Sequence, residues 1–383
     1  CVLAELLARD DADVDRIGVA LEVGCGGVSG SRKPLPRGSV AAGQPSLTTL
    51  TRHRWATRDD DTAYIIDRAA RAAGVRLDVP WRELTDEERA YAWGQLAWQA
   101  RAPEPQAALP ILPVQVQTDP VPSLGDAADD PAIWVHPSDP RKSRVLGTDK
   151  QGGLLAYDLA GKQLQDLRVG RMNNVDVRAG FDLNGQLVDL AVASNRDHNS
   201  LQLFAIDRSS GELRNLGQLP TSLTDIYGLC MFKDAAGAIH AIANDKDGTF
   251  VQYRLSADAG RIKGELVRQF KVASQPEGCV ADDRNQRLFV GEEDVAVWTL
   301  DARADAPARL EQVIAAGDVV HDDIEGLAIY QGATRDYLVI SSQGNDSYVV
   351  LDATAPYAVR GAFRIGLNAQ QGIDGASETD GLD

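Results

Sequence analysis

The sequence is poor in several features that would point to common protein classes. No apolar run reaches the roughly 18 residues that a membrane-spanning helix needs, so no membrane span is expected. The five histidines do not form an HExxH pattern, and there is no GxSxG motif, so neither zinc-protease nor serine-hydrolase chemistry is indicated. Basic residues are also scarce, with 39 Lys and Arg against 56 Asp and Glu. The resulting net charge of −17 argues against nucleic acid as a partner.

Cysteine is rare as well. The four cysteines are Cys1, Cys25, Cys230 and Cys279, and no CxxC pair suggests a metal site. Cys230 and Cys279 lie in apolar runs of neighbouring repeats, where a buried thiol behaves as a small apolar residue. The sequence therefore predicts no disulfide.

One module recurs along most of the chain. Each copy contains short apolar runs separated by turn signals, which is typical of consecutive antiparallel strands. One turn of the module can be followed at steps of 46 to 50 residues, through Lys150, Arg196, Lys246, Glu293 and Gln343. A period of this size with several strands per unit predicts a β-propeller with one blade per repeat.

The strand that opens each unit repeats too. The openings read DDPAIWV, NNVDV, YGLCMF, EGCVA and EGLAIY, and TDGLD follows near Asp380. Because the innermost strands of a propeller surround its channel, equivalent ends of these strands should meet at one rim. That rim is predicted to carry Asp129, Asp130, Tyr227, Glu277, Glu325 and Asp380.

The predicted rim combines carboxylates with cations. Elsewhere on such a chain, most acidic residues only make the surface soluble. Carboxylates crowded around one channel, however, would repel one another and raise their own pKa values, and a hard cation such as Ca²⁺ would relieve this repulsion. Lys150, Arg196 and Lys246 occupy the same turn of three successive repeats, so they should face the same opening.

The chain before the repeats has a different character. Residues 1–105 are predicted to form a small, mainly helical segment of unknown role, with helices at VLAELLARDD, 62–74 and 84–100. IGVALEVGCGG is similar to the strand and glycine turn of methyltransferases, but a lone motif of this kind is weak evidence. Residues 106–125 are rich in proline and predict a linker in which VQVQT could be an edge strand. The propeller is expected to cover 126–383.

The order of motifs resembles one family closely. DDPAIWVHP, NNVDVR, ASNR, DIYGLCMF, NDKDG, SQPEGCVADD, GEED, DIEGLAIY, SSQGNDSY and DGASETDGLD are similar to the β-propeller phytases, which are calcium-dependent. The resemblance implies an all-β, six-bladed propeller and a 3-phytase type of phosphoric monoester hydrolase. The substrate would be phytate or its calcium complex, and the products lower inositol phosphates and inorganic phosphate. Because the family's chains continue past DGLD, the last blade is expected to be truncated, leaving open edges, weak activity and a tendency to associate.

The resemblance also implies roles for individual residues. Several Ca²⁺ ions would be held in the channel mouth, and a metal-bound water would attack phosphorus. Catalysis and substrate binding would fall to Lys150, Arg196, Tyr227 and Lys246. The implied metal ligands are Asp129, Asp130, Glu277, Glu293, Asp323, Glu325, Asp374 and Asp380.

The protein is expected to be a monomer, and the resemblance implies an extracellular or periplasmic location. Two other readings stay open: a propeller that only binds partners, and a calcium-dependent lactonase or esterase. The cations in register opposite a ring of acids favour the phytase.

Overall fold

A computed structural model describes residues 2–6, 17–23, 109–368, 370–373 and 375–383. Residues 1–28 and 109–383 form one compact unit and 29–108 a second, and the fold described here belongs to the first. Its described residues are all-β apart from two 3-10 helices, η3 (Pro140–Lys142) and η4 (Gln343–Asn345). They contain no helix long and apolar enough to cross a membrane.

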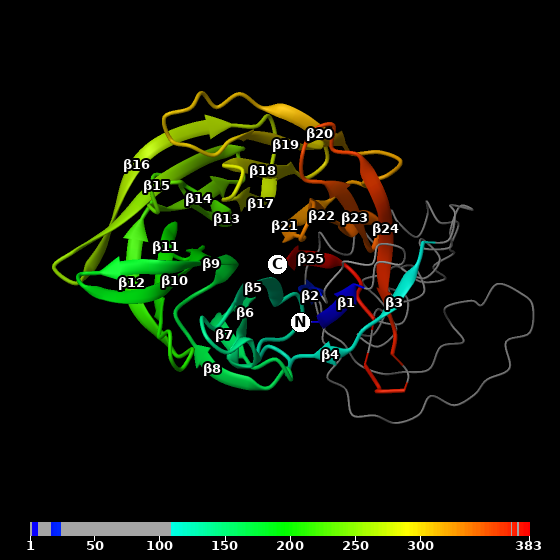
Figure 1. The fold of residues 1–383 in the computed structure, drawn as a ribbon, viewed down its shortest axis with the longest axis horizontal. Coiled ribbons are helices and arrows are strands. Elements are labelled where there is room, and N and C mark those ends of the chain that lie inside the picture. Colours follow the sequence, from blue (N-terminus) through cyan, green and yellow to red (C-terminus); the bar gives the residue numbers. More distant parts are fainter. Residues whose placement is uncertain (1, 7–16, 24–108, 369, 374) are drawn as a thin grey trace, which may run out of the picture. The chain divides into compact units, whose positions relative to one another are not determined.

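Five antiparallel blades succeed one another along the chain, and Figure 1 shows their first strands facing a common centre. This confirms the predicted β-propeller. The blades are, in order, β5 (Ala128–Trp134), β6 (Arg144–Asp149), β7 (Gly153–Tyr157), β8 (Gln163–Leu167); β9 (Met172–Leu183), β10 (Gln186–Asn195), β11 (Ser200–Ile206), β12 (Leu213–Pro220); β13 (Ile226–Lys233), β14 (Ile239–Asp245), β15 (Thr249–Asp258), β16 (Arg261–Lys271); β17 (Pro276–Asp282), β18 (Arg287–Glu292), β19 (Ala296–Asp301), β20 (Glu311–Ala315); and β21 (Ile324–Gln331), β22 (Asp336–Ser342), β23 (Ser347–Asp352), β24 (Val359–Gly366).

The core lies between the blades. Each neighbouring pair encloses one apolar cluster, such as the one that joins Leu190 of blade two to Val251 of blade three. Because both faces of a blade are covered, its middle strands read as continuous apolar runs rather than as alternating ones. Burial between blades therefore fixes the spacing of the inner strands around the channel.

A sheet of different origin lies between blades five and one. Among the described residues, five blades consist of consecutive strands, and the expected sixth blade, begun near Gly381 and left unfinished, is not what the structure shows. Instead β25 (Thr379–Leu382) pairs with β2 (Ile17–Val23), which pairs with β1 (Val2–Leu6), which pairs with β4 (Val116–Gln117). The inner strand β25 contacts β21 on one side and β5 on the other.

The strands before the first blade correct two expectations for this part of the chain. VLAELLARDD was expected to be helical, but Val2–Leu6 is a strand, because pairing with β2 and β4 outweighs the helical preference of Leu, Ala and Glu. The stretch 106–125 is not only a linker: it supplies β4, as the VQVQT pattern suggested, and β3 (Ile111–Pro113), which pairs in parallel with β24. The other two predicted helices lie outside the described residues.

A disulfide joins Cys230 of β13 to Cys279 of β17, which contradicts the prediction of free thiols. Both sulfurs lie in the apolar cluster between blades three and four, and their Cα atoms are 5.6 Å apart. Side chains alternate between the two faces of a strand, so Cys230 can point towards blade four while Cys279 points back towards blade three. The separation of 49 residues thus brings the two thiols together across a blade junction.

Candidate functional site

Every inner strand carries the same irregularity near its start. In all five blades and in β25, two residues of the inner strand lie opposite a single residue of its neighbour, which is a β-bulge. The first residues of these six bulges define what we call the channel mouth. They are Asp129, Asn173, Tyr227, Glu277, Glu325 and Asp380.

Hydrogen bonds outside the strand ladder complete the bulges. In blades one to three a side chain of the opposing residue accepts the N–H of the second bulge residue: Thr148 Oγ1 accepts from Asp130, Ser194 Oγ from Asn174, and Asn244 Oδ1 from Gly228. A backbone group that the bulge removes from the ladder is thereby satisfied. The bulge is a built feature of the repeat rather than a defect.

The second bulge residue is glycine in four of the six sheets, because the next blade leaves no room for a side chain. A Cβ on Gly228 would lie 1.9 Å from the carbonyl oxygen of Glu277, and one on Gly278 equally close to that of Glu325. A Cβ on Gly381 would meet Asp130 Oδ1 at 1.9 Å. Successive bulges are therefore in direct contact around the mouth.

A second residue of each repeat is fixed close to the mouth. The turn that follows the second strand of each blade donates a backbone N–H to the carbonyl two residues before the bulge. These contacts are 2.6 to 3.3 Å long and occur in all five blades. They place Lys150 near Asp129, Arg196 near Asn173, Lys246 near Tyr227, Glu293 near Glu277 and Gln343 near Glu325.

Three carboxylates converge at the mouth. Asp129, Glu277 and Asp380 each offer an oxygen within 4.8 Å of the others, and all three side chains are buried. Neither carboxylate oxygen of Asp129 has a hydrogen-bond partner among the described residues, although this side chain is 0% exposed. Burying carboxylate oxygens without partners is costly, so the cluster is suited to a cation that takes oxygen ligands.

The protonation of these acids reflects their crowding. Burial raises the pKa of Asp129 well above its usual value, and the charge of Asp380 raises it further. Burial likewise raises the pKa of Asp380 to about 7, against the opposing effect of Lys150. Burial and the nearby Glu277 raise the pKa of Glu325. A bound cation would favour the ionised form of all three groups.

Lys150 is the cation closest to the cluster. Its Nζ lies 3.1 Å from both Asp380 Oδ2 and Asp126 Oδ1, and 3.8 Å from Asp129 Oδ2. Burial alone would lower its pKa, but Asp129 and Asp380 raise it, so the ammonium stays charged. Lys150 therefore balances part of the acidic charge.

Arg196 and Lys246 have a different environment. Both lie against the ring of Tyr227, with Lys246 Nζ 4.2 Å and Arg196 Cζ 5.6 Å from its centroid. Such cation–π contacts orient the side chains without neutralising them. Within the described part of the chain, neither residue forms a salt bridge, so their charges remain available to an anion.

A second acidic zone lies on blades four and five. Burial, followed by the charges of Glu277 and Asp323, raises the pKa of Glu293 to about 7, although a hydrogen bond from Gln275 Nε2 opposes the shift. Burial and the charges of Asp294 and Asp322 raise the pKa of Asp323. Asp374, also expected as a metal ligand, lies outside the described residues.

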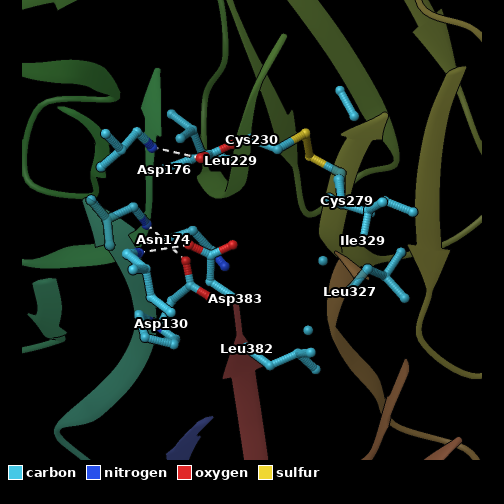
Figure 2. Close-up of a pocket in the computed structure, with 18 of the residues that line it drawn as sticks. Asp130, Asn174, Asp176, Leu229, Cys230, Cys279, Leu327, Ile329, Leu382 and Asp383 are labelled. Atoms are coloured by element: carbon cyan, nitrogen blue, oxygen red, sulfur yellow. Dashed lines mark hydrogen bonds between the residues drawn. A yellow bond between two sulfur atoms is a disulfide. The ribbon is translucent and has the colours of Figure 1, made fainter. Parts of the chain in front are cut away.

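Below the mouth the channel opens into a cavity of about 390 Å³. Figure 2 shows Asp130 and Asn174 in its lining, together with the Cys230–Cys279 disulfide. Asp130 was expected beside Asp129 as a metal ligand, but it is the second residue of its bulge. Its Oδ2 accepts a hydrogen bond from the Val175 N–H, so this carboxylate also connects blade one to blade two.

One residue of the mouth was absent from the predicted site. Asn173 is fully buried, and its Nδ2 donates a hydrogen bond of 2.6 Å to Glu277 Oε1. The signal was present in the sequence, because NNVDV begins at the same point of its repeat as DDPAIWV. Its amide carries neither the negative charge expected of a calcium ligand nor the positive charge expected of a phosphate ligand.

Comparison with known proteins agrees with this geometry. A family model described as Phytase matches residues 94–383. The sequence is also 41% identical over 277 residues to a protein named 3-phytase from Bacillus subtilis (strain 168), covering 70% of this chain and 72% of that protein.

Similar solved structures are more distant. A chain of a nidogen/laminin complex is 14% identical with a TM-score of 0.44, covering 67% of this chain and 83% of that one. The β-propeller domain of Cps50 (Swd1) from Myceliophteria thermophila is 13% identical with a TM-score of 0.42, covering 65% and 76%. These two carry no argument about function. The family match spans all five complete blades, and on it the chain belongs to the β-propeller phytase family and is a hydrolase.

Proposed function

We propose that this chain is a calcium-dependent phosphomonoesterase that hydrolyses phytate to lower inositol phosphates and inorganic phosphate. The observation that carries the proposal is the division of charge at the mouth. The buried carboxylate of Asp129 has no hydrogen-bond partner among the described residues, whereas Arg196 and Lys246 lie against the ring of Tyr227 and form no salt bridge with a described carboxylate. A polyanion such as phytate needs both, because an acidic protein would otherwise repel it.

The proposed binding set is Arg196, Tyr227 and Lys246. Arg196 can hold two phosphate oxygens with one guanidinium, whereas Lys246 acts as a point charge. Tyr227 keeps both cations on the same side of the mouth. Lys150, which was expected to belong to this set, is proposed instead to hold Asp129 and Asp380 in place and to reach substrate only at the border of the acidic cluster.

The proposed calcium ligands are Asp129, Glu277 and Asp380, with Glu325, Glu293 and Asp323 on the acidic side. Calcium, when bound, supplies positive charge that attracts phosphate oxygens and makes nearby water more acidic. The protein's own part is to hold these carboxylates close together, where a bound cation would favour their ionised form, and to keep the scissile phosphate beside them. Asp130 and Asp374 are proposed as further calcium ligands.

Phosphate release from phytate, measured with excess calcium and with excess chelator, tests the proposal. We expect turnover only with calcium. Binding of phytate without release of phosphate would favour a non-catalytic binding module. Hydrolysis of a lactone but not of phytate would favour the lactonase reading.

We also propose the compartment and the oligomeric state of the protein. Disulfides form mainly in oxidising environments, so the bond between blades three and four supports an extracellular or periplasmic location. We further propose a monomer, because β25 packs between β21 of blade five and β5 of blade one, which fills the place between these blades. Sedimentation or size-exclusion measurements would test this directly.

A further inference from the structure

Asn173 stands out among the six residues of the mouth. Four of the others are acids and one is tyrosine, so Asn173 alone carries a neutral amide. Its side chain is 0% exposed and lies at the bulge of β9 in blade two. Its hydrogen-bond partners come from both kinds of charged residue at the mouth.

The amide joins an acid to a cation. Its Nδ2 donates to Glu277 Oε1 at 2.6 Å and to Asn174 Oδ1 at 3.0 Å, and its Oδ1 accepts from Arg196 Nη1 at 3.2 Å. This orientation of the amide follows from its partners, since a carboxylate needs a donor and a guanidinium needs an acceptor. Glu277 belongs to the acid cluster, whereas Arg196 lies against Tyr227.

We propose that Asn173 is a positioning residue that sets the Glu277 carboxylate and the Arg196 guanidinium relative to each other. This rests on the proposed function, in which Glu277 holds calcium and Arg196 binds phosphate. One rigid, buried amide then fixes the separation between a metal ligand and a substrate ligand. A change at Asn173 should affect calcium binding and phytate binding together.

Other residue types cannot do the same. Aspartate would keep an acceptor for Arg196 but lose the donor to Glu277 and add a negative charge to a crowded cluster. Leucine would fill the space but make neither bond. The amide satisfies both charged partners without changing the net charge of the mouth.

The test uses two variants and a matched control. Asn173→Leu removes both bonds, and Asn173→Asp keeps the acceptor for Arg196 but removes the donor and adds a negative charge. Gln252→Glu serves as the control, because Gln252 is also a fully buried amide that accepts from an arginine, Arg268, and donates to a carbonyl, that of Ala302. It lies on β15, away from the inner strands.

Two readouts are measured for each protein: the calcium-dependent rise in melting temperature, and KM and kcat for phytate at saturating calcium. We expect Asn173→Leu to raise KM about tenfold, as for one lost hydrogen bond to a charged group, and to shrink the calcium-dependent rise. Asn173→Asp should shrink that rise as well. Gln252→Glu should lower the melting temperature without changing the calcium response or KM.

Combining Asn173→Leu with Arg196→Ala distinguishes a loss of positioning from a general loss of stability. In Arg196→Ala, the further change Asn173→Leu should no longer raise KM, because the guanidinium that it orients is gone. If Asn173→Leu raises KM equally in both backgrounds, or if both Asn173 variants lose only stability as Gln252→Glu does, the proposal is overturned. Failure of the parent to hydrolyse phytate would refute the proposed function, whereas the calcium-dependent melting would still decide the link to Glu277.

Discussion

The two sides of the mouth share one backbone and differ in charge. In blades one to three the turn residue above the bulge is a cation, and in blades four and five it is Glu293 or Gln343. The same backbone contact holds all five turns. A repeated scaffold can therefore present opposite charges across one opening, because the bulge and the turn fix where a side chain lies but not which one it is.

The contrast is sharpest between blades three and four. Tyr227 and Lys246 on blade three are proposed to bind an anion, while Glu277 and Glu293 on blade four are proposed to bind a cation. The disulfide joins these two blades. The cationic side, the acidic side and the disulfide between blades three and four can each be perturbed separately.

Removing calcium should have the largest effect, because it leaves the acidic side with uncompensated charge. We expect phytate turnover to fall by about 100-fold or more and the melting temperature to fall by several degrees, since a ligand that binds only the folded state stabilises it. Activity and calorimetric melting are compared in chelator and in millimolar calcium. Equal melting temperatures would show that the carboxylates do not bind the ion.

Breaking the junction should have the next largest effect. The double variant Cys230→Ala, Cys279→Ala is expected to lose about 2–4 kcal/mol of unfolding free energy, because the disulfide restricts the unfolded chain. Chemical denaturation without reductant measures this loss. The matched condition is the parent protein in reductant, whose unfolding free energy should approach that of the variant. Equal unfolding free energies of parent and variant without reductant would mean that the bond does not form.

Removing one cation should weaken substrate binding on the cationic side only. Arg196→Ala and Lys246→Ala are each expected to lower kcat/KM, with a loss of transition-state stabilisation of about 1.5–3 kcal/mol and little change in melting temperature. Lys150→Ala should instead alter the calcium-dependent melting, because Lys150 contacts Asp129 and Asp380. Lys271→Ala is the control, because Lys271 pairs with the exposed Asp247 and should affect neither kcat/KM nor the calcium-dependent melting. Identical behaviour of all three cation variants would erase the distinction drawn between Lys150 and the other two.

The dependence on pH should be the smallest effect. In the folded protein the pKa values of Glu293 and Asp380 are raised to about 7, so both groups hold protons that the unfolded chain releases near pH 4. Without calcium, stability should therefore fall as pH rises from about 4 to 7. Calcium favours the ionised form, so the rise in melting temperature that it causes should be larger at pH 8 than at pH 5.5. A rise that is the same at both pH values would contradict this.

The sequence predicted the repeat and most of the mouth, because both depend on local patterns. Asp129, Glu277 and Asp380 were expected together from their places in opening strands, and the structure brings them within reach of one another. The disulfide was missed because its cysteines are offset by one residue within their repeats. The sheet of β25, β2, β1 and β4 was missed because it pairs segments far apart in the sequence, and Val2–Leu6 alone favours a helix.

The close contacts of Gly228, Gly278 and Gly381 with the next bulge have a consequence for how such a site can diverge. A side chain at one of these positions would push on the neighbouring blade, and the displacement would pass from bulge to bulge. At the first bulge position the same backbone already carries Asp, Asn, Tyr and Glu in different sheets. New specificities can therefore arise more readily by substitution at the first bulge position than at these three glycines, where the neighbouring blade would have to change as well.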